Sequence, residues 1–158
     1  MIQGIDVALS QLGIAEATGK NDGIPAERYM RGDKLAWCAG FVLWCNANSD
    51  DENLATSTKE HYAMRSVTSM IEHCKRKGIF LSSQDTTPQR NDIVFFGDTD
   101  SDVGVKGSHV GIVESFDPTT RKLTSIEGNY GNKVARVTQV IGKRKITGFA
   151  RPDLLEKR

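Results

Sequence analysis

Two cysteines stand in one apolar stretch, LAWCAGFVLWC (residues 35–45), and either could be a nucleophile. A cysteine attacks as the thiolate, and the positive end of a helix or a neighbouring imidazole favours that form. Gly32 and Asp33 predict a chain break before this stretch, which places Cys38 in the opening turn of a helix. Cys45 lies two turns further in, among apolar neighbours that make a thiol inert. We therefore predict Cys38 as the nucleophile; the alternative is one more buried helix cysteine.

A thiolate nucleophile needs a base that can later protonate the leaving amine, and histidine suits both tasks near neutral pH. The chain has 3 histidines. His61 and His73 have polar neighbours on a predicted helix, which favours a solvated surface position. His109, in GSHVGIVES, follows two small residues and begins an apolar strand, so a ligand has room and the ring is held. We predict His109 as the base; the alternative is a structural histidine of the core or strand edge.

The segment SIEGNYGN supplies candidates for a third group, which would accept the far ring N–H and orient the imidazole. Glu127 and Asn129 are two residues apart on a predicted strand, so both are expected on one face of the sheet. If that strand neighbours the strand of His109, either side chain could reach the ring. Glu127 is the better candidate because a carboxylate also stabilises an imidazolium. Asn129 could instead orient the ring or bind substrate.

The elements expected to position these groups begin with helices. Apolar residues at three- and four-residue steps predict a helix over 2–12 that Gly13 closes, and a second helix covers 35–47. A third is expected from about Lys59 to Lys77, with Gly78 as its stop. Residues 18–34 have the composition of an ordered surface loop.

In the second half of the chain, the periodicity of apolar residues is that of short strands. The five predicted strands are NDIVFFGD (91–98), SHVGIVESF (108–116), KLTSIEGN (122–129), VARVTQVIG (134–142) and KITGFARP (145–152). Helices followed by an antiparallel meander predict an α+β fold. We expect a single domain over 1–152, with N-terminal helices packed on a C-terminal antiparallel sheet, and a short charged tail over 153–158.

Composition and charge limit the other possibilities. The formal net charge of +1 requires neither nucleic acid nor a membrane as partner, and no apolar run is long enough to span a bilayer. The 3 cysteines have no zinc-ligand spacing. The acidic run DTDSD (98–102) starts like a calcium loop but lacks the later EF-hand ligands. A solvated hairpin loop is expected there, with a non-EF calcium site as the alternative, and no metal or cofactor is expected. The N-terminus does not read as a signal peptide, which predicts synthesis in the cytoplasm.

Four motifs, by their residues and their order along the chain, resemble the CHAP family of cysteine- and histidine-dependent amidohydrolases and peptidases. They are WCAGFV, PQRNDIVFF, SHVGIVES and IEGN. The resemblance covers roughly Ile2 to Pro152 and implies a papain-like fold. It also implies Cys38 as nucleophile, His109 as general base and acid, Glu127 as the orienting acid and Asn129 as an auxiliary polar group. The family usually has Gly at the position of Asn91, a departure expected to affect only a turn.

The function implied by the resemblance is hydrolysis of peptidoglycan, either between muramic acid and L-alanine or within the stem peptide or cross-bridge. The alternatives are a cysteine amidase or transferase with a non-wall substrate, and a non-catalytic binding or structural domain. We expect a monomer delivered to the wall by a holin-type lesion, a virion or a secretion machine. An effector would have a cognate immunity protein as partner, and an endolysin a holin.

The oxyanion of the tetrahedral intermediate also needs hydrogen-bond donors. The backbone N–H of Cys38, at the predicted helix start, is the first candidate. Tyr29 and Asn21, in the preceding loop, are candidates for the second.

Overall fold

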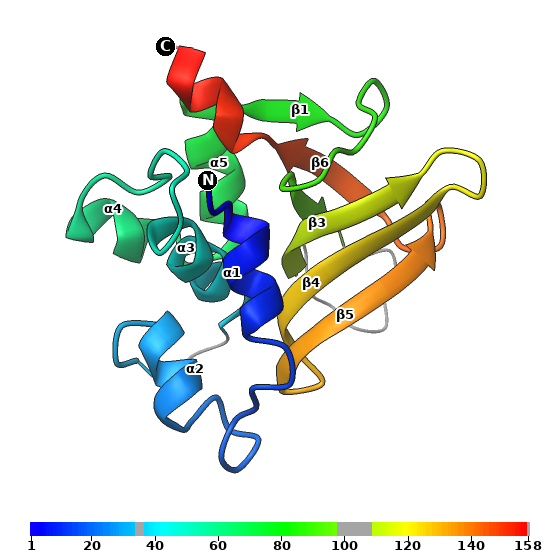
Figure 1. Ribbon diagram of the computed structural model, residues 1–158. Coiled ribbons are helices and arrows are strands. Elements are labelled where there is room, and N and C mark those ends of the chain that lie inside the picture. The colour runs from blue at the N-terminus through cyan, green and yellow to red at the C-terminus, as the bar shows by residue number, and fades with distance from the viewer. Residues whose placement is uncertain (34–36, 98–108, 158) are drawn as a thin grey trace.

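The structure, a computed structural model, describes residues 1–33, 37–97 and 109–157. Helices occupy the first half of the chain and pack on a sheet formed by the second half (Figure 1). The helices are α1 (Gly4–Ser10), α2 (Ile24–Tyr29), α3 (Cys38–Ala47), α4 (Thr58–Ala63) and α5 (Val67–Arg76). The α+β, papain-like architecture predicted from the sequence is confirmed.

Six strands form one antiparallel sheet. They are β1 (Phe80–Ser82), β2 (Ile93–Phe96), β3 (His109–Asp117), β4 (Lys122–Tyr130), β5 (Lys133–Val140) and β6 (Ile146–Ala150). The order in the sheet is β1-β6-β2-β3-β4-β5, so only β2 to β5 form the predicted meander. β6 crosses back to pair with both β2 and β1. The strand β1 was not expected from the sequence, because three residues are too few to show a period.

The helix α3 is the central element of the core. Eight of its ten residues are buried, which agrees with its apolar character on every face. It contacts β3 and β4, and a Cβ on Gly128 of β4 would lie only 2.6 Å from Cβ of Phe41. A Cβ on Gly40 would likewise overlap Met30. These two glycines therefore let α3 approach the sheet and the segment after α2 closely.

Two predictions for the helical half are wrong. The helix expected over 59–77 is divided into α4 and α5, because Ser57 and Ser66 each cap a new helix with a side-chain oxygen. The loop expected over 18–34 contains the short helix α2, which has Pro25 in its first turn.

Asn91 has a larger role than the sequence analysis predicted. Its φ of +78° explains why glycine suits this position. Its buried side chain also accepts a hydrogen bond from Ile5 N (2.9 Å) and donates one to the Asp51 carboxylate (2.9 Å). Asp51 in turn accepts from Gly4 N at 2.9 Å. The expectation that Asn91 affects only a turn is therefore wrong, since the residue connects α1, the loop after α3 and the start of β2.

The segment expected as a charged tail continues into the fold. Residues Pro152–Lys157 form a 3-10 helix, η1. Leu154 and Leu155 are partly buried and pack against the main core. A second, smaller apolar cluster covers the opposite face of the sheet and contains Val94, Phe96, Val113, Leu123 and Phe149.

Candidate active site

Cys38 is the first residue of α3, as the sequence predicted for a nucleophile. It is 8% exposed, and its side chain is in hydrogen-bond contact with His109. The preceding residue, Trp37, is fully buried and donates its indole N–H to Glu16 Oε2 at 2.6 Å, which holds the start of the helix against the loop of Glu16. The thiol is therefore placed at the helix N-terminus, beside an imidazole.

Cys45 has the opposite environment. It is fully buried in α3, and burial raises its thiol pKa well above the ordinary value. Cys74 on α5 is also buried, and burial raises its pKa to about 12. Both thiols are protonated at neutral pH and are chemically inert as nucleophiles.

His109 is the first residue of β3 and lies between Cys38 and Glu127. Its Nε2 is 3.0 Å from Glu127 Oε1, although the N–H bond is not directed along the line joining the two atoms. Nδ1 is then the ring nitrogen available to the thiol. Burial alone would lower the pKa of His109, but its contacts with Cys38 and Glu127 outweigh burial and raise the pKa to about 9. The ring is therefore held in a site that favours the imidazolium.

Glu127, on β4, is fully buried, and each of its oxygens has two partners. Oε1 contacts His109 Nε2 and Arg144 Nη2, each at 3.0 Å. Oε2 accepts from Arg144 Nη1 at 3.0 Å and from Ser125 Oγ at 2.7 Å. Burial by itself would raise the pKa of this carboxyl, but His109 and Arg144 outweigh it and lower the pKa. Glu127 is therefore a carboxylate with four stabilising contacts.

A glycine on β3 makes room for this carboxylate. A Cβ on Gly111 would lie 2.6 Å from Cγ of Glu127. Gly111 and His109 are two residues apart on β3, so the glycine leaves the space beside the histidine to the side chain of Glu127.

Asn129 lies at an irregularity of β4. The pairing of β4 with β5 shifts register between Glu127 and Tyr130, and Asn129 has a φ of +58°, so the simple alternation of side chains is interrupted. Within the described residues, the Asn129 side chain makes no hydrogen bond to His109. Its auxiliary role stays a prediction.

Neither candidate for the second oxyanion donor gains support. The Tyr29 hydroxyl is committed to Gln11 Oε1 at 2.8 Å, within a buried cluster of aromatic rings. The backbone N–H of Asn21 donates to Glu16 Oε1 at 3.0 Å. The backbone N–H of Cys38 lies in the first turn of α3, where amide groups point out of the helix end.

His61 departs from its predicted solvated position. It is 8% exposed, and burial, with the nearby charges of Arg31 and Arg65, lowers the pKa of its ring. It is the buried residue of α4. His73 is half-buried near the end of α5.

Metal binding receives no support from the part of the chain that the structure describes, where no three His, Cys, Asp or Glu side chains are placed to hold an ion. The Asp22 carboxylate accepts hydrogen bonds from the backbone N–H and the hydroxyl of Thr18. The acidic run 98–102 lies outside the described residues. Among the described helices, none is long and apolar enough to cross a membrane.

Arg144 and Ser125, the two further partners of Glu127, were not expected from the sequence. A buried acid in an apolar strand requires a counter-charge, which is the signal that could have prompted a search. Three consecutive basic residues, Lys143 to Lys145, do not show which one turns inward. Ser125 could have been inferred, because it shares a strand face with Glu127 two residues away.

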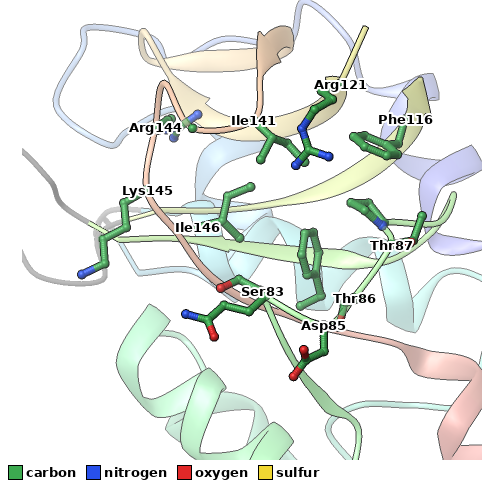
Figure 2. Close-up of a pocket in the computed structure, with 14 residues that line it drawn as sticks. Ser83, Asp85, Thr86, Thr87, Phe116, Arg121, Ile141, Arg144, Lys145 and Ile146 are labelled. Carbon is green, nitrogen blue, oxygen red and sulfur yellow. The ribbon is translucent and has the colours of Figure 1, made fainter. Parts of the chain in front are cut away.

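A pocket of about 360 Å³ lies elsewhere, on the face of the sheet that carries the smaller apolar cluster. Figure 2 shows Arg121 and Ile141 on one side of it and Ser83, Asp85 and Thr86 on the other. None of the four residues predicted from the sequence lines this pocket, but Arg144 does. Arg144 therefore connects the pocket wall to the buried carboxylate.

Comparison with known proteins identifies the family of the chain. A family model described as the CHAP domain matches residues 30–129, a segment that contains Cys38, His109, Glu127 and Asn129. No curated protein matches the chain.

Two solved structures are similar in fold. The structure of Ly7917 has 17% sequence identity and a TM-score of 0.57, with 95% of this chain and 61% of that chain covered. Ly7917 with the hydrolyzing product of MDP has 16% identity and a TM-score of 0.55, with 94% and 61% covered. The chain thus spans about three fifths of the length of the structures it resembles.

Proposed function

Because the chain belongs to the CHAP domain family, we propose that it is a thiol-dependent hydrolase that cleaves an amide bond of peptidoglycan. CHAP domains are typically cysteine-dependent amidases or peptidases. The observation that carries the proposal is the row of Cys38, His109 and Glu127, contributed by the start of α3 and by β3 and β4. Ly7917, similar in fold, was determined with the hydrolyzing product of MDP, which supports a peptidoglycan substrate.

The proposed reaction begins with transfer of the Cys38 proton to His109. The thiolate attacks the amide carbonyl carbon, and the resulting oxyanion accepts a hydrogen bond from the backbone N–H of Cys38. His109 then protonates the leaving amine, the C–N bond breaks and a thioester remains. A water molecule that His109 deprotonates hydrolyses the thioester and regenerates the thiol. Throughout, Glu127 holds the ring and offsets the charge of the imidazolium.

The deciding experiment is incubation of the purified protein with isolated peptidoglycan, followed by mass spectrometry of the released fragments. Stem peptides with a free L-alanine amine indicate an amidase, and glycan strands with shortened stems indicate an endopeptidase. Cys38→Ser is the matched control, since it changes one atom of the proposed nucleophile. Release of the same fragments by this variant, or of none by the wild-type protein from several wall types, would contradict the proposal.

A further inference from the structure

The Glu127 carboxylate is held by hydrogen bonds on both of its oxygens. A carboxylate offers about four lone-pair directions, and here Arg144 takes one on each oxygen. Ser125 takes another on Oε2, and His109 Nε2 lies 3.0 Å from Oε1, although its N–H does not point along that line. Because Arg144 approaches both oxygens at 3.0 Å, the plane of the carboxylate follows the plane of the guanidinium.

The guanidinium is itself held by an aromatic ring. Its central carbon lies 3.7 Å from the centre of Phe96, which pairs directly with His109 across β2 and β3. Tyr130 lies 5.7 Å away and also contacts the His109 ring, with 6.2 Å between ring centres. Stacking on Phe96 fixes the orientation of the planar group in a way that an ammonium group could not reproduce.

We propose that Arg144 is a positioning residue, which sets the orientation of the His109 ring by fixing the rotation of the Glu127 carboxylate. This inference rests on the proposed function and deepens it by adding a fourth side chain to the row of Cys38, His109 and Glu127. No hydrogen bond joins Arg144 to the His109 ring among the described contacts, so its hydrogen-bonded route to the ring runs through Glu127.

A purely structural role predicts different behaviour. If Arg144 only balanced the charge of a buried carboxylate, any cation that reached Glu127 would serve as well. If it positions the carboxylate, the two-pronged shape of the guanidinium matters in addition to its charge. Arg144→Lys retains the charge and loses the fork, and Arg144→Met loses both. The pair of variants therefore separates charge from orientation.

The matched control is Arg136→Met. Arg136 lies on β5 and bonds Glu114 of β3 at 2.9 Å, so this variant also removes a glutamate-bonded arginine from the sheet, but away from the site. Two readouts are compared on folded protein. One is the NMR titration of the His109 ring, which needs no substrate. The other is kcat and KM on a soluble peptidoglycan fragment.

In Arg144→Met we expect the His109 pKa to rise, because Glu127 then shares its negative charge with His109 alone. In Arg144→Lys the pKa stays near the wild-type value. In both variants kcat falls by about tenfold to a hundredfold, as expected for a misplaced catalytic group, while KM changes little. Arg136→Met leaves both readouts unchanged.

The proposal is overturned if Arg144→Lys has wild-type kcat, since charge alone would then suffice. It is also overturned if the His109 titration of Arg144→Met matches that of Arg136→Met. If the wild-type protein cleaves no peptidoglycan, the proposed function fails; the titration still shows whether Arg144 is coupled to His109, and an unchanged His109 pKa in Arg144→Met still overturns the proposal.

Discussion

Replacing Glu127 by glutamine isolates the charge of the buried carboxylate from its shape. The amide keeps one acceptor oxygen, but its NH2 group must face one of the donors that now surround the carboxylate, which are Arg144, Ser125 and His109. The Glu127→Gln variant therefore removes the charge next to the imidazole with almost no change in volume.

The magnitude follows from the short His109–Glu127 contact. An opposite charge at such a distance moves a pKa by roughly one to three pH units, and His109 now has a pKa of about 9. In Glu127→Gln the ring should therefore titrate at roughly 6 to 8. With the tautomer and the imidazolium no longer stabilised, turnover should fall by roughly two orders of magnitude or more.

The same charge gives stability a pH dependence. The pKa of His109 in the folded protein lies above its ordinary value of 6.5. The stabilising contribution of the protonated ring to the free energy of unfolding is therefore fully present below pH 6.5 and is lost as the pH rises through about 9. The wild-type protein should thus lose free energy of unfolding over this window, and Glu127→Gln should lose less. Chemical denaturation at a series of pH values measures the difference.

NMR titration of His109 and rates of wall cleavage provide the assay, with circular dichroism to confirm that each variant is folded. Glu114→Gln is the control, because Glu114 also pairs with an arginine on the sheet. Asn129→Ala should cost less than Glu127→Gln, since one neutral hydrogen bond is worth about 0.5–1.5 kcal/mol. A Glu127→Gln variant with near-normal turnover and a His109 pKa still near 9 would refute the reasoning. If Asn129→Ala at the same time lost most of its turnover, Asn129 would be the orienting residue.

The remaining predictions concern the cysteines, metal and Asn91. Cys38→Ser should stay folded and lose wall-degrading activity, whereas Cys45→Ala should keep most activity at some cost in stability; iodoacetamide should label native Cys38 first, and preferential labelling of Cys45 would end the assignment. Activity should survive excess EDTA, and its abolition by EDTA with recovery on adding calcium would reveal a site that we did not identify. Asn91→Gly keeps the backbone conformation but strands the buried N–H of Ile5, so the free energy of unfolding should fall by about 1–3 kcal/mol, and an unchanged denaturation midpoint would contradict this.

The sequence predicted those parts of the site that depend on local chemistry. The position of Cys38 at a helix start follows from the break before it, and the contact of His109 with Glu127 follows from neighbouring antiparallel strands. The sequence pattern could not predict Arg144, because this residue reaches Glu127 from the connection between β5 and β6. Only tertiary packing decides which basic side chain of that connection turns inward. The direction of the Asn129 side chain could not be predicted, because a two-residue alternation does not reveal a register shift or a positive φ.

The errors in the fold have similar causes. Apolar periodicity continued across Met64 to Val67, so it could not show that Ser66 ends one helix and starts another. β6 pairs between β1 and β2 and does not continue the meander beside β5. The local sequence pattern does not show beside which strand a new strand will pair. His61 was assigned to the surface from its polar neighbours, but the direction of α4 decides its burial.

The bond between Asn91 and Ile5 has a consequence for the order of events during synthesis. The two residues are 86 positions apart, so at about 5–20 residues per second the ribosome supplies Asn91 roughly 4 to 17 s after Ile5. A helix as short as α1, with 7 residues, has no stability of its own. The hydrogen bond that Asn91 makes to the first turn of α1 can therefore form only after the start of β2 has emerged, and until then α1 depends on its packing against α3.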